Sequence, residues 1–303
     1  IRRTMQSYDI PELTEPALRN LAQHFAFALK PGDVLALEGD LGAGKTTFAR
    51  ALIETLAGKA GMEIPSPTFT LVQSYHPPRF EVAHFDLYRL SAPEELHELG
   101  LEHALKTGIA VIEWPERAGD LLPAERFTLR LSESGSEETR NATLSATPAL
   151  APRLERLIEL RDFVIEYGWD VAEFSYLQGD ASPRRYARLA HDDGRNAVLM
   201  DSPKQPDGPP VRDGLPYSRI AHLAEDVRAF VAVGRALRDA GFSAPDFYAS
   251  DLAHGLLLIE DLGDAVFGSE VKRGEVPGFL WRAGVDTLVA LRAEIDRIDL
   301  EMH

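Results

Sequence analysis

The chain has 303 residues, of which 45% are hydrophobic and 26% are charged, the balance of an ordinary folded protein. Its length predicts two domains, since one domain usually takes about 100–200 residues. The absence of cysteine excludes a disulfide scaffold and any zinc or iron–sulfur site held by Cys. No apolar run approaches the roughly 18–20 residues of a membrane span, and we expect no signal peptide at the N-terminus.

The net charge of −16 is spread over the whole chain, with −7 in residues 1–150 and −9 in residues 151–303. Proteins that bind nucleic acid directly usually present a basic face, because neutralisation of the phosphates supplies much of their affinity. Net charge does not exclude a local basic patch. Even so, we expect no tight, direct binding of DNA or RNA by this chain.

The first half alternates predicted helices and strands, which is typical of an α/β protein. In chain order, the apolar patterns predict an amphipathic helix over 12–30, a buried strand over 34–38, a helix over 46–58, strands over 69–73 and 81–86, a short acidic helix over 94–100, and strands over 108–113 and 127–131. Residues 132–141 are polar, and 147–152 resemble a linker.

A glycine-rich loop lies between the first predicted strand and the helix after it. The run Gly39-Asp40-Leu41-Gly42-Ala43-Gly44-Lys45-Thr46 fits G-x-x-x-x-G-K-[ST] at every fixed position. Glycines let successive backbone N–H groups turn toward a phosphate, and the helix N-terminus adds partial positive charge. Lys45 is suited to the β- and γ-phosphates of a nucleotide and the Thr46 hydroxyl to Mg²⁺.

Two acidic residues end apolar strands and are candidates for the metal or the attacking water. Asp86 ends the strand over 81–86, and Glu113 ends the strand over 108–113. Ligands of open α/β sheets gather at the carboxyl ends of the strands, so we expect both acids on the same edge as the loop. Spacing alone does not divide the two roles, and either acid is also consistent with a solvated strand end.

The segment Ser66-Pro67-Thr68 precedes a predicted strand and is stiffened by proline. It is compatible equally with a switch-like segment near the γ-phosphate and with a rigid loop.

Four blocks in order resemble the TsaE (YjeE) family of bacterial P-loop ATPases. They are Gly39–Thr47, Ser66–Val72, the His-Phe-Asp-Leu-Tyr-Arg run over 84–89, and the Glu-Trp-Pro-Glu run over 113–116. The resemblance covers about residues 8–147. It implies a cytoplasmic ATPase with ATP and Mg²⁺ as cofactors, needed for N6-threonylcarbamoyladenosine at position 37 of tRNA. It also implies binding to the TsaD–TsaB complex, which would carry the tRNA.

The same resemblance implies roles for individual residues. Lys45 would hold the phosphates, and Thr46 would ligate Mg²⁺ together with the acids Glu113 and Asp86. Asp86 would act in metal binding or hydrolysis. Trp114 would lie beside the nucleotide, and Thr68 in the switch-like segment. The nucleotide-binding set is then Gly39, Asp40, Leu41, Gly42, Ala43, Gly44, Lys45, Thr46, Thr47, Thr68 and Trp114.

The second half is predicted to be α+β. Its patterns predict a helix over 153–167, strand-like pieces around 176, 186–189 and 197–200, a long helix over 220–241, a strand pair around 247–249 and 256–260, and a helix over 278–298. The order resembles the N-terminal lobe of aminoglycoside-phosphotransferase-like kinases, especially amino-sugar kinases related to AmgK. Domains are therefore expected at 1–147 and 156–303, joined by a linker over 148–155.

Two departures limit the kinase resemblance, in which Gly179–Arg185 would be the nucleotide loop and Glu260–Leu262 would lie near the hinge. The strand ending at Asp201 has no lysine, and Lys204 lies three residues beyond. Nothing like the catalytic loop H-x-D-x-x-x-x-N, or the metal-binding aspartate after it, occurs before His303. We therefore expect no amino-sugar kinase activity from these 303 residues.

The predicted function is an ATPase that binds and cycles the TsaB–TsaD complex. The alternatives are a fusion whose full-length form also phosphorylates a cell-wall amino sugar, a small-molecule P-loop kinase, and a non-enzymatic protein in which ATP only orders a docking surface. An Arg-rich lid, typical of small-molecule kinases, is not seen between residues 90 and 110. The non-enzymatic role differs from the ATPase because it needs ATP-dependent binding of a partner but no ATP hydrolysis, so replacing Asp86 or Glu113 would distinguish the two.

Overall fold

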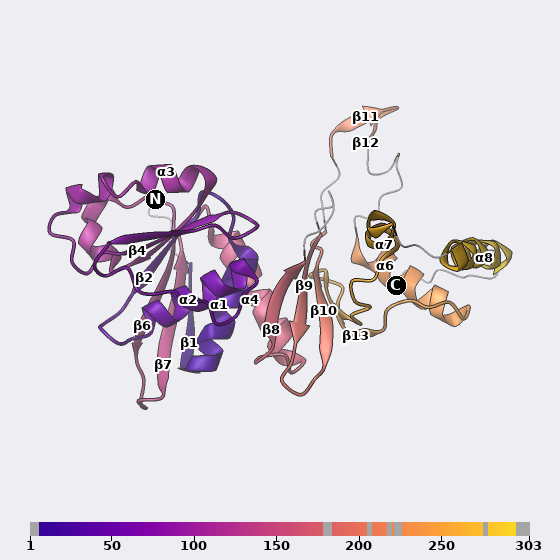
Figure 1. Cartoon of the computed structure of the whole chain (residues 1–303), viewed down its shortest axis with the longest axis horizontal. Coiled ribbons are helices and arrows are strands. Elements are labelled where there is room, and N and C mark those ends of the chain that lie inside the picture. Colours follow the sequence, from indigo (N-terminus) through magenta and orange to yellow (C-terminus); the bar gives the residue numbers. More distant parts are fainter. Residues whose placement is uncertain are drawn as a thin grey trace. The chain divides into compact units, whose positions relative to one another are not determined.

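The structure is a computed structural model, and it describes residues 6–177, 184–204, 208–216, 220, 226–274 and 278–294. The chain forms two compact units, one within residues 1–176 and 189–194 and the other within 177–188 and 195–303 (Figure 1). Among the described residues, no helix is both long and apolar enough to cross a bilayer.

The first unit is a mixed α/β fold around a seven-stranded sheet with the order β1-β7-β6-β2-β5-β4-β3. Its elements are β1 (Gln6–Thr14), α1 (Glu15–Ala28), β2 (Val34–Glu38), α2 (Lys45–Ala57), β3 (Val72–Tyr75), β4 (Glu81–Asp86), η1 (Pro93–His97), α3 (Leu101–Thr107), β5 (Gly108–Glu113), η2 (Pro115–Leu121), β6 (Phe127–Glu133), β7 (Thr139–Ala146) and α4 (Ala151–Glu166). The central strands β6, β2, β5 and β4 are parallel. At one side β7 pairs antiparallel with β6 and β1 pairs antiparallel with β7, and at the other side β3 pairs antiparallel with β4.

Strands β2, β4 and β5 are buried on both faces, which is why they are mostly apolar runs in the sequence, whereas β6 has exposed residues from Arg130 onward. Alternate residues of β2 enter different cores. Leu35 and Leu37 pack with α1, α2 and α4, whereas Val34 packs with η1, α3 and η2 on the other face. The sheet is therefore covered by helices on both sides, as Figure 1 shows. This arrangement confirms the predicted α/β class with a mainly parallel centre.

Several element boundaries differ from those predicted. The expected helix over 12–30 begins at Glu15, where Thr14 caps it by accepting from the Ala17 N–H, and strand β1 occupies 6–14 before it. The predicted strand over 69–73 is β3 at Val72–Tyr75, because Leu71 takes a positive φ of 63°. The short acidic helix is the 3₁₀ turn η1. The polar 132–141 segment contains the end of β6, the connection between the two strands and the start of β7.

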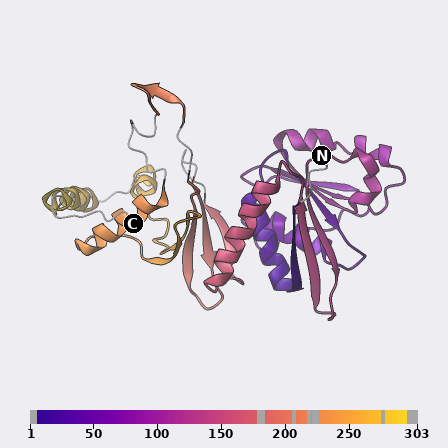
Figure 2. The ribbon, with the colours of Figure 1, turned by 180° about the vertical axis from the view of Figure 1, so that it is seen from behind.

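Helix α4 begins at Ala151, inside the segment predicted as a linker, and it packs against α1 (Figure 2). Leu154 and Leu157 belong to the core of the first unit. Arg153 donates to both carboxylate oxygens of the buried Asp33, at 2.7 and 2.5 Å, and to the Ala28 carbonyl at 2.9 Å. The first unit thus extends through α4 to Tyr176, beyond the predicted boundary at 147.

The elements assigned to the second half include a sheet with the order β13-β14-β10-β9-β8. The elements are β8 (Glu173–Leu177), β9 (Arg185–Ala190), β10 (Asn196–Asp201), β11 (Pro210–Arg212), β12 (Leu215–Pro216), α6 (Val227–Asp239), β13 (Phe247–Asp251), β14 (Leu256–Ile259), α7 (Phe267–Arg273) and α8 (Gly278–Glu294). The predicted strand pair is the antiparallel pair β13–β14. Val227 and Val231 of α6 pack on Met200 and Leu257.

Parts of three predictions for the second half lie outside the described residues. Residues 179–183 of the expected nucleotide loop Gly179–Arg185 are among these, as are 221–225 of the expected long helix and 295–298 of the last helix. Arg185, at the end of that predicted loop, forms an ion pair with the buried Asp201.

Acid should destabilise the first unit through His24. Its Nδ1 lies 2.9 Å from the Asn20 carbonyl, its Nε2 has no hydrogen-bond partner among the described residues, and burial lowers the pKa of His24 to about 4. The unfolded chain takes up this proton near pH 6.5 but the folded chain only near pH 4. Stability therefore falls as pH decreases through this window, by about 2 kcal/mol between pH 7 and pH 5.

Denaturant unfolding at pH 7 and pH 5 measures this effect. His24→Gln should lose most of the difference, whereas His76→Gln, which alters a histidine whose side chain is 72% exposed, should retain it. Equal pH dependence in wild type and His24→Gln would contradict the prediction.

A cavity in α4 should destabilise the first unit. Leu154 is fully buried, so Leu154→Ala should lower the free energy of unfolding by about 2–5 kcal/mol. The control Glu159→Ala alters a side chain that is 41% exposed and should change stability by about 0.5 kcal/mol or less. Thermal unfolding of the full chain tests both, and equal effects would show that α4 is not part of this core.

Candidate nucleotide site

The glycine-rich loop connects β2 to α2, as its position in the sequence predicts. Gly39, Gly42 and Gly44 have φ values of 140°, 79° and 106°, a region that side chains disfavour. A Cβ built on Gly39 would lie 2.4 Å from the Leu131 carbonyl oxygen, so this position has no room for a side chain. The loop is a tight turn that ends at the N-terminus of α2, a geometry able to hold a phosphate.

The other predicted loop residues lie around this turn. Asp40, Leu41 and Gly42 are exposed, and Leu41 is 80% exposed. Ala43 is buried, and Thr47 is half-buried in the first turn of α2.

Lys45 is the first residue of α2, and its side chain folds back over the loop. Its Nζ donates to the carbonyl oxygens of Gly39 at 2.6 Å and Asp40 at 2.8 Å, and it lies 3.7 Å from the centroid of the Trp114 ring. Burial lowers the pKa of the Lys45 ammonium, while nearby carboxylates, Glu113 first, oppose this shift. Trp114 is half-buried in a left-handed conformation directly after β5.

The two predicted acids are brought together by sheet register. Asp86 and Glu113 are paired positions of the parallel strands β4 and β5, and Glu113 is also paired with Leu37 of β2. Both acids are buried, with 3% and 2% exposure. The alternative of a solvated strand end, left open for each acid, does not fit this burial, and each carboxylate is hydrogen-bonded to protein groups.

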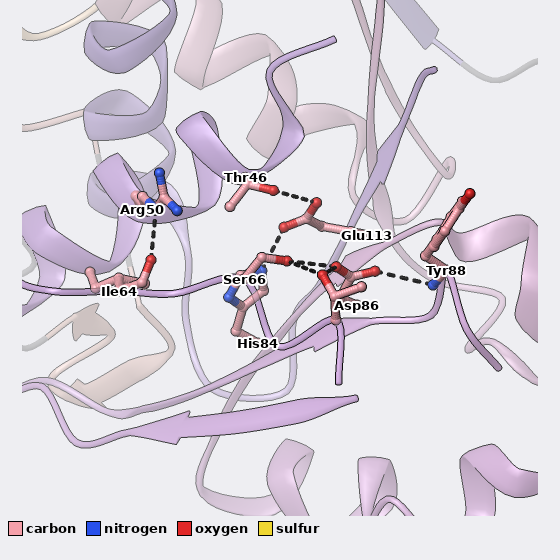
Figure 3. A network of polar contacts seen from close by, with 9 residues as sticks. Thr46, Arg50, Ile64, Ser66, His84, Asp86, Tyr88 and Glu113 are labelled. Atoms are coloured by element: carbon pink, nitrogen blue, oxygen red, sulfur yellow. Dashed lines mark hydrogen bonds and ion pairs between the residues drawn. The ribbon is translucent and has the colours of Figure 1, made fainter. Parts of the chain in front are cut away.

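Glu113 is held by one hydrogen bond on each carboxylate oxygen (Figure 3). Thr46 Oγ1 donates to Oε2 at 2.8 Å, and His84 Nε2 lies 2.8 Å from Oε1. This contact joins the start of α2 to the ends of β4 and β5.

Asp86 is held by a different set of donors (Figure 3). Ser66 Oγ and Thr68 Oγ1 each donate to Oδ2 at 2.6 Å, and the Tyr88 backbone N–H donates to Oδ1 at 3.1 Å. The Ser66-Pro67-Thr68 segment is therefore anchored at the strand end through Asp86. This places Thr68 at the same edge as the glycine-rich loop.

The oxygen atoms gathered at this edge match the ligands that Mg²⁺ prefers. They are the Thr46 hydroxyl and the carboxylates of Glu113 and Asp86. The part of the chain that the structure describes contains no group of three or more His, Asp or Glu side chains arranged to hold a metal alone. A Mg²⁺ ion here would therefore take further ligands from phosphate and water, as Mg²⁺ sites usually do.

His84 and Ser66 belong to this cluster but carry no predicted role of their own. The signal for His84 is its spacing, because residues two apart share one face of a strand and His84 thus accompanies Asp86. Ser66 is part of the recognised proline-containing segment, yet only the folded loop shows that its hydroxyl reaches Asp86.

The comparisons with known proteins concern the first unit. The family model described as "Threonylcarbamoyl adenosine biosynthesis protein TsaE" matches residues 13–142. A crystal structure titled "Bacillus subtilus YdiB" is similar with a TM-score of 0.43 and 28% identity, covering 52% of this chain and 97% of that one.

Two curated relatives share the printed name "tRNA threonylcarbamoyladenosine biosynthesis protein TsaE". The protein from Rickettsia bellii is 46% identical over 118 residues, which are 39% of this chain and 81% of that protein. The protein from Bacillus subtilis is 39% identical over 150 residues, which are 49% of this chain and 87% of that protein. The chain thus covers most of each relative with high identity, and it belongs to the TsaE family of tRNA threonylcarbamoyladenosine biosynthesis.

Proposed function

We propose that the first unit is an ATPase that uses Mg²⁺ and supports formation of threonylcarbamoyladenosine in tRNA. The observation that carries this proposal is the hydrogen bond from Thr46, at the end of the glycine-rich loop, to the buried Glu113 on the neighbouring strand. This hydrogen bond places the glycine-rich turn and a buried acid at one edge of the sheet, and phosphoryl transfer needs a phosphate-binding turn and a cation-holding acid close together.

The proposed roles follow from what each side chain contacts. The loop over 39–44 would bind phosphate through its N–H groups, and Lys45 would add a positive charge. Bound Mg²⁺ would neutralise charge that develops on the phosphate oxygens. Thr46 and Glu113 would hold that cation, since they already contact each other.

Asp86 would orient the attacking water. Its carboxylate contacts the Ser66 and Thr68 hydroxyls and not the Thr46 hydroxyl, which supports a role apart from the metal. Thr68 would then act in a segment that senses the γ-phosphate. Trp114 would lie beside the nucleotide, because its ring already covers Lys45.

The proposed partner is the TsaB–TsaD complex, whose cycling would depend on ATP turnover in the cytoplasm. The net charge of −16 supports a protein partner in preference to tRNA. No arginine finger is evident in the loop sequence, so isolated turnover should be slow and the partner should complete the site.

For residues 156–303 we propose a fold like the N-terminal lobe of aminoglycoside-phosphotransferase-like kinases. Antiparallel pairing of β14 with β10 and β13, and packing of α6 on this sheet, support an α+β lobe. The described end of β10 carries Asp201, paired with Arg185, where a protein kinase would have its phosphate-binding lysine nearby.

ATP hydrolysis by the purified chain tests the proposal. We expect slow turnover alone, faster turnover with TsaB and TsaD, and a loss of about 10²–10³-fold in Lys45→Ala, because one charged contact to the transition state is removed. Asp86→Asn should bind ATP but lose hydrolysis, which separates catalysis from a purely nucleotide-ordered docking role. An ATP hydrolysis rate that does not change when TsaB and TsaD are added would contradict the proposed coupling of turnover to these partners.

Two glycine substitutions test the loop. A Cβ built on Gly42 has no atom within 4 Å. We therefore expect Gly42→Ala to cost only about 1–2 kcal/mol, because alanine disfavours the positive φ at this position. Gly39→Ala has an unfavourable φ as well and would place Cβ against the Leu131 carbonyl. It should weaken ATP binding at least about tenfold more than Gly42→Ala, measured by calorimetric titration. Equal affinities would contradict the proposed loop geometry.

A further inference from the structure

Three side chains joined by hydrogen bonds lead from the loop into the protein interior. Thr46 Oγ1 bonds to one oxygen of Glu113, and His84 Nε2 bonds to the other, both at 2.8 Å (Figure 3). His84 is fully buried on β4, and its hydrogen bond to Glu113 links it to Thr46 at the end of the loop. We therefore expect an effect of His84 on ligands at the loop to pass through Glu113.

The chemistry of this contact fixes the direction of the hydrogen bond. A carboxylate that holds a cation is ionised and only accepts hydrogen bonds, so the proposed role of Glu113 places the proton between the two groups on His84 Nε2. With one donor on each oxygen, Glu113 is held in a single orientation and its Oε2 faces Thr46. Without His84, the Oε1 atom would be buried without its donor, and the carboxylate would be free to rotate away.

Packing alone does not explain a histidine at this position. Its Nδ1 is buried and has no hydrogen-bond partner among the described residues, which is unfavourable for stability. An apolar side chain would fill the same space between β4 and its neighbours without that cost. The histidine is therefore accounted for by what its other nitrogen does, which is to donate to Glu113.

We propose that His84 is a positioning residue that orients the Glu113 carboxylate toward Thr46 and thereby sets the affinity of the site for nucleotide-bound Mg²⁺. The proposal rests on the proposed function, because it takes Thr46 and Glu113 as the groups that hold the cation. Outer donors to metal-binding carboxylates commonly change metal affinity or activity by about 10–100-fold when they are removed.

The test uses the full chain and two substitutions of different chemistry. His84→Phe fills the space with a ring that cannot donate, and His84→Gln retains an N–H donor. Calorimetry measures the dissociation constant of ADP with EDTA and with saturating Mg²⁺, so no hydrolysis is needed. We expect His84→Phe to reduce the Mg²⁺-dependent gain in affinity about 10–100-fold with little change in EDTA. His84→Gln should stay within about threefold of wild type.

A double-mutant cycle with Glu113→Gln separates positioning from general structural damage. If His84 acts through Glu113, His84→Phe should add less than about twofold in the Glu113→Gln background. Multiplicative effects, or an equal loss in the Phe and Gln variants, would overturn the proposal. If His84→Phe does not fold, as judged by its melting temperature, a Mg²⁺ response of His84→Gln as poor as that of Glu113→Gln would overturn it instead.

Failure of the proposed function has a different signature. A wild-type chain that binds no ADP with or without Mg²⁺ would overturn both proposals together. A wild-type chain with normal Mg²⁺-dependent binding, unchanged in His84→Phe, would overturn the role of His84 alone.

Discussion

Two buried carboxylates at the ends of adjacent strands impose the main constraint on this structure. A buried charge without donors is costly, so Asp86 and Glu113 must each be surrounded by N–H and O–H groups. Those donors come from separate parts of the chain, namely the start of α2, strand β4 itself and the 66–68 segment. Satisfying the two acids thus fixes the glycine-rich loop, the sheet edge and the proline-containing segment relative to one another.

The parts of the fold that were predictable are those buried on both faces. Strands β2, β4 and β5 are apolar runs because helices cover both sides of them, and the loop between β2 and α2 has a specific glycine spacing. Strands β1 and β7 are half polar, with burial that alternates or is irregular, and they pair with each other across more than 120 residues of chain. A local pattern carries no record of such pairing, so neither was predicted as a strand, and the end of β1 was included in the predicted helix over 12–30.

The acids of the site were predictable as residues, but their surroundings were not. A strand that ends in Asp or Glu is visible in the sequence, whereas the register that pairs Asp86 with Glu113 is a property of the assembled sheet. The same holds for Thr46 and His84, which lie 67 and 29 residues from Glu113. Helix α4 shows the converse case, because proline and small residues around 147–152 suggested a linker, whereas the helix begins at Ala151 and its Leu154 packs in the core of the first unit.

Under the proposed function, the charges at this edge would explain why a cation is required. Lys45 is held by two backbone carbonyls and an aromatic ring rather than by a carboxylate, so its charge is only partly compensated and is available to a phosphate. Asp86 and Glu113, in contrast, would face an incoming polyphosphate with like charge. One lysine does not balance two carboxylates and a phosphate chain in a poorly solvated site, where such repulsion is strong. A divalent cation held by Glu113 would offset that repulsion, and nucleotide affinity would then depend on how firmly Glu113 is held in place.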